Sequence, residues 1–242
     1  MEERLDKLLV QLNLVDTRSE AEKIILEIGV HVNGKLINKP GKKFKKDCHI
    51  KFIDNSKQWL SIDANKIVSA IDKWNLEISG NVFLDVFSGL GASTEVLFSN
   101  KAKKVYLNDS VKDSYSNSLS VNNIVNSTGL YLRELTSSHV SGKLDGCIIN
   151  SSDTLMSKTL PFVHPFLNKG AFVIVVIKPR VEVDKNNLKN NGELRNSLGY
   201  SSMFVKLKET AEVNNLDLLD YFKSPILGDD GKEEFILYLR KI

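Results

Sequence analysis

The spacing of apolar residues divides the chain into two parts. Across residues 4–29 they recur every three or four positions, which predicts two short helices, the second capped by Asp16 or Thr17. Apolar residues then alternate around Asn33-Gly34, a strong signal for a two-residue hairpin turn. The first part is therefore predicted to be a small α+β module that ends in a polar linker.

From residue 61 onward, short apolar stretches alternate with stretches of helical period. Ser61 is expected to cap the first helix of this part, with Asp63 placed favourably for the helix dipole. The expected strands are residues 82–87, 104–107, 130–132, 147–149, 172–177, 218–222 and 234–239. Such alternation predicts an α/β fold with a mostly parallel sheet and helices on both faces, in which the last two strands can pair antiparallel.

The composition is that of a reduced, globular protein. Of 242 residues, 42% are hydrophobic and 26% are charged, which argues against disorder, collagen and coiled coil. The longest apolar run, residues 171–177, is far shorter than the ~20 residues of a membrane helix, and no secretory signal is found. Cys48 and Cys147 are far apart, so we expect no disulfide framework and a cytoplasmic location.

The excess positive charge lies in the first quarter of the chain. Residues 1–57 contain 12 Lys and Arg against 9 Asp and Glu, whereas the remaining residues contain 21 of each. Seven lysines between residues 35 and 51 share that stretch with a single acid, Asp47. A solvated loop would explain such a run. In a small separate module, however, it favours a polyanionic partner, nucleic acid first.

A glycine-rich turn follows the first strand of the second part. Its residues 85–91 read Asp-Val-Phe-Ser-Gly-Leu-Gly, and the glycines let backbone N–H groups approach an anionic ligand at a helix N-terminus. Thr94 stands where the dinucleotide fingerprint has its third glycine, which disfavours NAD. Asp109, after the second strand, suits either a ribose-binding carboxylate or a helix cap. Asp85, Gly89, Gly91 and Asp109 together fit S-adenosylmethionine. Phe87, Ser88 and Thr136 are further expected cofactor contacts.

Short motifs in both parts resemble those of known families. The first part resembles the RNA-binding domain named for the fourth small-subunit ribosomal protein, through Arg4-Leu5-Asp6, Arg18-Ser19, Ala21 and Val30-His31-Val32-Asn33-Gly34-Lys35. The second resembles the TlyA family, hemolysin-named and FtsJ-like ribosomal RNA methyltransferases, through Lys178-Pro179, Leu194-Arg195, Ser224-Pro225-Ile226-Leu227-Gly228 and residues 234–241. The resemblance implies an RNA-binding domain over 1–57, a linker over 58–61 and a Rossmann-like class I methyltransferase domain with a seven-stranded sheet over 62–242.

The resemblance also implies an activity. Family members transfer a methyl group from S-adenosylmethionine to the ribose 2′-hydroxyl of cytidines in ribosomal RNA, so ribosomal RNA or ribosomal subunits are the expected partners. We expect phosphate contacts from the basic residues of the first part, which would position the RNA rather than specify its sequence. These residues are Arg4, Arg18, Lys35, Lys42, Lys43, Lys45 and Lys46.

The family's Lys-Asp-Lys-Glu tetrad around the target hydroxyl falls on Lys66, Asn150, Lys178 and Glu234. A lysine accepts the hydroxyl proton only in its neutral form, which a second cation nearby favours, while carboxylates orient it. Asn150 brings no charge where the family has aspartate. Asp153 and Asp63 are the candidate substitutes.

Two more features leave the function open between three classes. The family's Ser-Arg-Gly-Gly stretch before the first lysine reads Ser-Ile-Asp-Ala-Asn at residues 61–65, so its contacts do not carry over. The Asn-rich loop 184–196 either closes over RNA or is disordered. An RNA 2′-O-methyltransferase is the first interpretation. A degenerate relative that binds RNA without turnover is the second, and a membrane-lytic hemolysin, which no hydrophobic segment supports, is the third.

Overall fold

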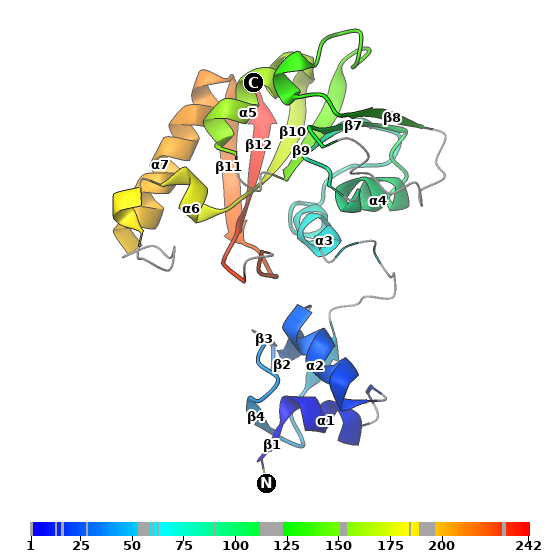
Figure 1. Cartoon of the computed structure of the whole chain (residues 1–242), viewed down its shortest axis with the longest axis vertical. Coiled ribbons are helices and arrows are strands. Elements are labelled where there is room, and N and C mark those ends of the chain that lie inside the picture. Colours follow the sequence, from blue (N-terminus) through cyan, green and yellow to red (C-terminus); the bar gives the residue numbers. More distant parts are fainter. Residues whose placement is uncertain are drawn as a thin grey trace. The chain divides into compact units, whose positions relative to one another are not determined.

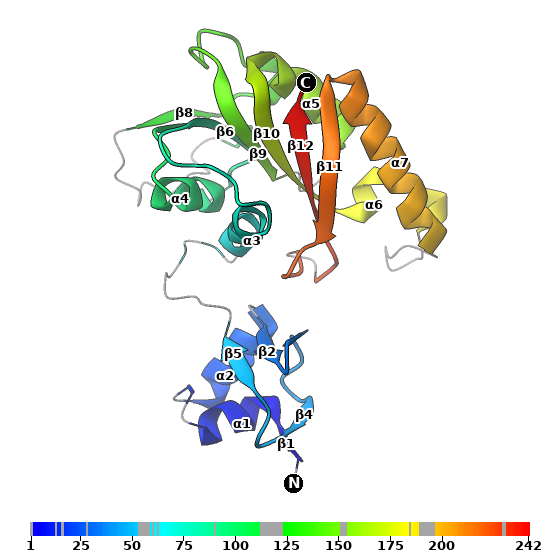
Figure 2. The same ribbon diagram turned by 180° about the vertical axis from the view of Figure 1, so that it is seen from behind.

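A computed structural model describes residues 2–12, 14–15, 17–27, 29–52, 59, 61, 63–89, 91–111, 123–150, 154–183, 185–188, 197–228 and 231–242. The chain forms two compact units, Met1–Ile62 and Asp63–Ile242, called here the N-terminal and C-terminal units (Figures 1 and 2). Several sequence-based predictions fall outside the described residues: the Asp16 cap, Asp153, Leu194-Arg195 and most of the linker and of loop 184–196. The exact domain limits therefore stay predictions.

The N-terminal unit consists of two helices and two small sheets. Helices α1 (Leu5–Gln11) and α2 (Arg18–Glu27) pack against a three-stranded sheet of order β3 (Lys35–Ile37), β2 (Val30–Val32) and β5 (Ile50–Phe52). Strands β1 (Glu2–Arg4) and β4 (Lys43–Lys45) form an antiparallel pair. Asn33 and Gly34 both have positive φ, 52° and 76°, as a two-residue hairpin turn requires. The predicted helices and hairpin are thus confirmed.

The C-terminal unit is built on one seven-stranded sheet of order β11-β12-β10-β9-β6-β7-β8. The neighbours among β6 (Val82–Val86), β7 (Lys104–Asp109), β8 (Ile124–Thr128), β9 (Leu144–Asn150) and β10 (Leu167–Ile177) pair parallel. Strand β12 (Phe235–Lys241) lies antiparallel between β10 and β11 (Leu216–Lys223). The expected mostly parallel sheet with an antiparallel final pair is confirmed.

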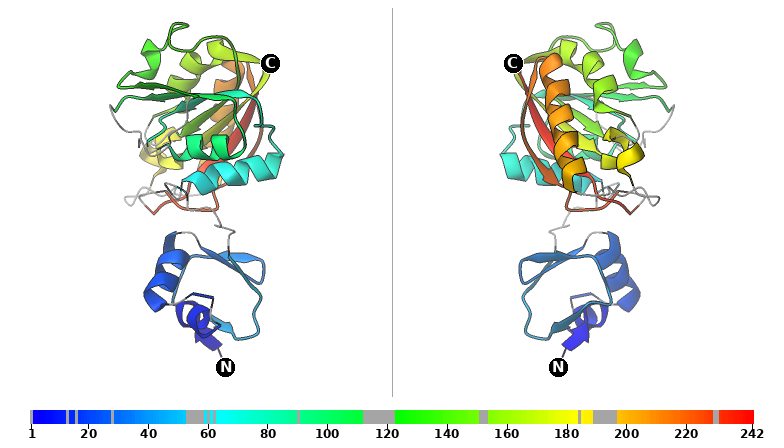
Figure 3. Two further views of the ribbon diagram at one scale, coloured as in Figure 1. Left: turned by 90° about the vertical axis from the view of Figure 1, so that its right-hand side faces the viewer. Right: turned by 90° about the vertical axis from the view of Figure 1, so that its left-hand side faces the viewer.

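Helices cover both faces of this sheet (Figure 3). Helices α5 (Met156–Val163) and α7 (Ser197–Val213) pack with one set of alternate strand residues, including Leu84, Cys147 and Val175, in the main core. Helices α3 (Ala64–Trp74) and α4 (Ala92–Ser99) lie against the other face. A short helix, α6 (Pro179–Glu182), and three 3₁₀ turns, Leu132–Glu134, His164–Phe166 and Lys185–Asn187, complete the unit.

Two local predictions were wrong. The strand expected at 130–132 is absent, and the edge strand of the sheet is β8, which ends before Gly129 (φ 87°). Leu132 belongs to a 3₁₀ turn, and its side chain packs in the core. Strand β8 was not predicted because its sequence is half polar, and an edge strand needs no continuous apolar run. Helix α3 begins at Ala64 rather than beside Ser61, and the residue at its N-cap is Asp63.

Helices long and apolar enough to cross a membrane were searched for in the part of the chain that the structure describes, and none was found.

Candidate methyl-transfer site

The predicted site residues of the C-terminal unit gather at one edge of the sheet. The parallel strands β6, β7, β9 and β10 all end there, at Val86, Asp109, Asn150 and Ile177. Strand β12 runs the opposite way, so its start at Phe235 lies at the same edge. The carboxyl edge of a parallel sheet is where open α/β folds bind their ligands.

The glycine turn joins β6 to α4 through a run of unusual backbone angles. Phe87 (φ 58°), Gly89 (φ 52°) and Gly91 (φ 87°) all have positive φ, and Gly91 is the N-cap of α4. The Phe87 N–H donates to the carbonyl of Asn108 on β7 (2.8 Å), which ties the turn to the neighbouring strand. A positive φ at phenylalanine is uncommon and costs conformational energy. The turn is therefore held in a shape that the sheet imposes.

Asp85 is a fully buried carboxylate beneath this turn. Its Oδ2 accepts a hydrogen bond from Thr94 Oγ1 on α4 (2.7 Å), while Oδ1 has no hydrogen-bond partner among the described residues. Burial raises the pKa of Asp85 to about 7, against the lowering effect of the Thr94 bonds. Thr94, which sequence reasoning noted only as the missing glycine, is thus the side chain that anchors Asp85.

Asp109, at the end of β7, is tied to the glycine turn. Its Oδ2 accepts the N–H of Gly89 (3.0 Å) and its Oδ1 accepts the N–H of Val111 (3.0 Å). Each carboxylate oxygen can accept two hydrogen bonds, so both Oδ1 and Oδ2 keep one lone pair for a ligand hydroxyl. The ribose-binding interpretation of Asp109 thus fits its free lone pairs, whereas a helix that it would cap lies outside the described residues.

The residues around the turn fit a polar ligand with several hydrogen-bond donors. Besides Asp85 Oδ1, two buried oxygens, Ser88 Oγ and Asn108 Oδ1, have no partner among the described residues. Buried polar atoms without partners are rare in folded proteins and call for an explanation. Sequence analysis did not single out Asn108, because it follows the strand expected at 104–107 and belongs to no motif, whereas the structure places it inside β7. Thr136 is exposed and bonded to Ser138 and His139, and no described contact joins it to the turn.

A buried lysine–carboxylate cluster lies at the same edge. Lys66 on α3 is almost fully buried, and its Nζ lies 2.5 Å from Asp63 Oδ1 and 2.6 Å from Glu234 Oε2. Burial acts to lower the pKa of Lys66, but the two carboxylates outweigh it, and the pKa is raised above its ordinary value. Lys66 is therefore a fixed cation. Residues 66 and 234 come together only through the fold.

Strand register places Lys178 beside this cluster. Ile177 pairs with Phe235 across β10 and β12, so the next residues outward, Lys178 and Glu234, face each other. Burial raises the pKa of Glu234, and the charges of Lys66 and Lys178 oppose that shift. Asn150 pairs with Val176 and so shares the sheet face of Lys178.

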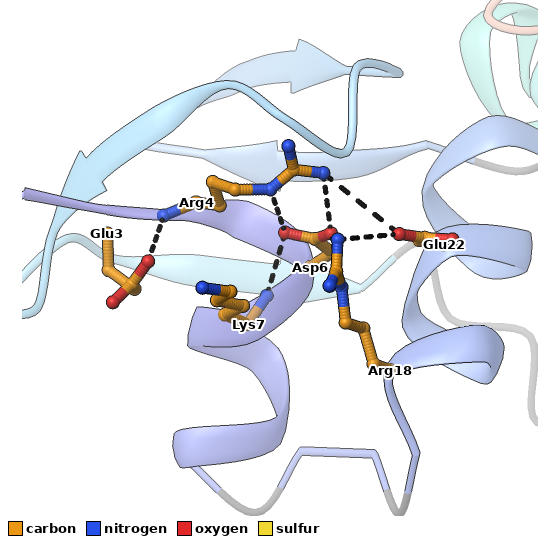
Figure 4. A network of polar contacts seen from close by, with 6 residues as sticks. All are labelled: Glu3, Arg4, Asp6, Lys7, Arg18 and Glu22. Carbon is orange, nitrogen blue, oxygen red and sulfur yellow. Dashed lines mark hydrogen bonds and ion pairs between the residues drawn. The ribbon is translucent and has the colours of Figure 1, made fainter.

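The predicted RNA-contacting residues of the N-terminal unit fall into two groups. The five lysines 35, 42, 43, 45 and 46 are exposed, and among the described residues none forms an ion pair. Arg4 and Arg18 instead hold the fully buried Asp6 (Figure 4): Arg4 Nη2 lies 2.8 Å and Arg18 Nε 2.9 Å from Asp6 Oδ2. Hydrogen bonds from Arg4 and Arg18 keep the pKa of Asp6 well below its usual range, against burial.

A strand–glycine turn–helix with acidic residues at the ends of the first two parallel strands, beside a buried lysine–carboxylate cluster, defines a methyltransferase of the nucleotide-binding α/β class. The FtsJ-like methyltransferase family model matches residues 59–241, and the chain belongs to that family. A model of the S4 domain matches residues 3–47. The resemblance noted in the sequence is confirmed.

Two curated proteins and a solved structure are similar to nearly the whole chain. "Putative rRNA methyltransferase YqxC" of Bacillus subtilis is 23% identical over 98% of this chain and 85% of its own. "16S/23S rRNA (cytidine-2'-O)-methyltransferase TlyA" of Mycobacterium tuberculosis is 24% identical over 98% of this chain and 89% of its own. The solved structure "Putative hemolysin from Streptococcus thermophilus" has a TM-score of 0.74 at 24% identity, covering 99% of this chain and 88% of that one.

Proposed function

We propose that the protein is an S-adenosylmethionine-dependent RNA methyltransferase that methylates the 2′-hydroxyl of a cytidine in ribosomal RNA. The observation that carries the proposal is the cluster of Lys66, Glu234 and Lys178 at the sheet edge that also holds the glycine turn. The name of the TlyA relative supports this choice of nucleotide and hydroxyl. Ribosomal RNA as substrate corresponds to a cytoplasmic protein.

The residues of the glycine turn would hold the cofactor. Gly89 and Gly91 let the backbone come close to it, Asp109 has free lone pairs for ribose hydroxyls, and Asp85 has a free buried oxygen for a cationic group. Phe87, Ser88 and Thr136 remain further candidate contacts. When bound, the cofactor supplies a methyl group activated by its sulfonium charge.

Lys178 would take the proton from the ribose hydroxyl. The bound cofactor would supply the methyl carbon to the 2′-oxygen with loss of its bond to sulfur, and the hydroxyl proton would pass to the Lys178 amine. Glu234 contacts Lys66 and, by strand register, faces Lys178, so it would orient the lysine amine. Holding the hydroxyl in line with the methyl group supplies much of the acceleration.

The N-terminal unit would bind RNA through its exposed lysines. Lys43 and Lys45 are two residues apart on β4, so their side chains project from the same side of that strand. Lys35, Lys42 and Lys46 add charge nearby in the sequence. Arg4 and Arg18 also remain candidates, since their side chains keep 38% and 51% of their surface exposed while they hold Asp6.

Asn150 favours one alternative, a protein that binds RNA and cofactor without turnover. Asn150, at the end of β9, lies on the same face of the sheet as Lys178, and its side chain brings no carboxylate there. Mapping of ribose methylation by mass spectrometry on ribosomal RNA, from cells with and without the protein, separates the two. A 2′-O-methyl cytidine that disappears with the protein supports the enzyme. No difference in methylation, with RNA and cofactor still bound by the purified protein, supports the alternative.

A further inference from the structure

Asp63 lies at the start of α3 but does not act as an ordinary helix cap. An aspartate at an N-cap normally accepts backbone N–H groups of the first turn with its side chain. Asp63 makes no side-chain cap bond, and its own φ and ψ, −57° and −24°, are those of a helix. Its backbone carbonyl accepts the Lys66 N–H (3.0 Å), while its Oδ1 contacts the Lys66 ammonium at 2.5 Å. The Asp63 carboxylate therefore contacts the Lys66 ammonium and does not cap the helix.

We propose that Asp63 is a positioning residue of the methyl-transfer site, the second carboxylate that, with Glu234, fixes Lys66 as the cation beside Lys178. This inference rests on the proposed function. It answers the question that Asn150 raises, because it places a carboxylate on the cluster from the α3 side instead of from the end of β9.

The charge count of the cluster supports this role. Lys66 is a cation throughout and Lys178 becomes a second one when it takes the proton, while the described anions within ion-pair distance of Lys66 are Glu234 and Asp63. Removing one partner of a buried ion pair is strongly destabilising, because it leaves an uncompensated buried charge. With Asn150 neutral, Glu234 alone would face two cations. Asp63 makes the numbers of charges equal.

Electrostatics and geometry agree on what Asp63 does to Lys66. Burial disfavours the charged form of Lys66, and the charges of Glu234 and Asp63 restore it, so that the pKa is raised. Lys66 Nζ lies between oxygens of two different elements, the N-terminus of α3 and the residue before β12. Two anchors leave the ammonium little freedom to swing. The cation therefore keeps its place relative to Lys178, which follows the adjacent strand β10.

The test compares Asp63→Asn, Asp63→Glu, Asn150→Asp and the double variant Asp63→Asn/Asn150→Asp in the full chain. Asp72→Asn is the matched control, since Asp72 is an exposed acid on the same helix. The first measurement is an NMR titration of the lysine side chains, labelled with ¹³C at the ε-carbon, without cofactor or RNA. Lys66→Arg identifies the Lys66 signal. The second is single-turnover methyl transfer to ribosomal subunits as a function of pH, with cofactor and RNA affinities measured separately.

We expect Asp63→Asn to lower the titration midpoint of Lys66 by about one pH unit or more. It should slow methyl transfer about 10- to 100-fold while leaving both affinities unchanged. Asp63→Glu should keep most of the rate, and Asn150→Asp should restore part of it in the Asp63→Asn background. Asp72→Asn should change none of these quantities.

Other outcomes overturn the inference in distinguishable ways. If Asp63→Asn leaves the Lys66 titration and the rate unchanged, Asp63 does not position Lys66. If Asp63→Asn and Asp63→Glu both lower the melting temperature and both affinities together, its role is structural. If the Lys66 midpoint falls in Asp63→Asn but the unaltered protein methylates no RNA, the charge arrangement holds while the proposed function fails.

Discussion

Asp6 in the N-terminal unit and Lys66 in the C-terminal unit are both ions removed from solvent, but their partners differ in exposure. The two arginines that hold Asp6 keep 38% and 51% of their side-chain surface exposed. Glu234 and Asp63, which hold Lys66, keep 4% and 24%. The first cluster leaves its cations in water, whereas the second removes both a cation and a carboxylate from it.

The difference separates a structural ion cluster from one suited to chemistry. In the Asp6 cluster, half-solvated arginines from β1 and α2 join the start of α1 at a small desolvation cost (Figure 4). In the Lys66 cluster the desolvation cost is larger. The buried ion pairs therefore contribute less stability than apolar packing of the same volume would. Buried charges of this second kind, gathered at the edge of a parallel sheet, are typical of functional sites. The following variants test that distinction.

The largest effect is expected from Lys178→Ala. If Lys178 accepts the hydroxyl proton, the single-turnover rate of methyl transfer should fall about 10²- to 10⁴-fold. Cofactor affinity, measured by calorimetry, should stay unchanged because the partner of Lys178 is the RNA. Lys206→Ala, which removes an exposed lysine of α7, is the control. A Lys178→Ala protein of normal rate would contradict the assignment.

Asp85→Asn should stabilise the protein and weaken cofactor binding. The folded-state pKa of about 7 lies above the ordinary value of 3.8, so the folded state binds this proton more tightly than the unfolded state. Stability therefore falls as pH rises from about 4 to about 7, and asparagine removes that loss. At pH 8 we expect a gain of about 2 to 4 kcal/mol in the free energy of unfolding.

Urea unfolding at pH 4 and pH 8 measures the stability change, and Asp217→Asn, an exposed acid on β11, is the control. Calorimetry should show that cofactor affinity of the unaltered protein rises with pH through 7, because the ionised Asp85 binds a cationic group better. An unchanged affinity in Asp85→Asn would show that this carboxylate does not contact the cofactor.

Asp6→Asn should destabilise the N-terminal unit without touching the chemistry. Loss of charged hydrogen bonds to Arg4 and Arg18 should cost about 2 to 3 kcal/mol. The pKa of Asp6 is lowered in the folded state, so this stability is present above the ordinary carboxyl range and is lost as pH falls below about 4.

Thermal unfolding followed between pH 2 and pH 7 checks this prediction, with Asp47→Asn, an exposed acid of the same unit, as control. The rate of methyl transfer at saturating RNA should stay normal. A large loss of rate there would mean that the two clusters do not differ in role as we infer.

The smallest effect is expected from Lys43→Ala/Lys45→Ala on β4. Removal of two phosphate contacts should reduce the slope of log affinity against log salt by about 1.4 for single-stranded RNA. Filter-binding titrations over a range of salt concentrations measure the slope. Lys158→Ala/Lys208→Ala, which removes two exposed lysines of the C-terminal unit, should leave the slope unchanged. Equal slopes in all three proteins would make the lysine run a solvated loop only.

The two-part organisation, the glycine turn and most of the sheet could be predicted from the amino-acid sequence. These follow from local patterns: helical spacing in residues 4–29, the Asn33-Gly34 turn, and short apolar stretches with glycines between strand and helix. Strand β8 was not predicted, because it lies at the edge of the sheet and its half-polar sequence has no strong period.

Which charged side chains contact one another depends on the tertiary structure and could not be predicted from the sequence. Asp6 has the polar residue type expected on a helix surface, yet packing of α1 against α2 and β1 buries it completely between two arginines. Lys66 and Glu234 are separated by most of the C-terminal unit, and they meet because β12 inserts antiparallel beside β10. Sequence left Asp63 and Asp153 as alternatives to the missing carboxylate. The ion pair of Asp63 with Lys66 depends on where α3 begins and on what faces it across the sheet edge, which no local pattern encodes.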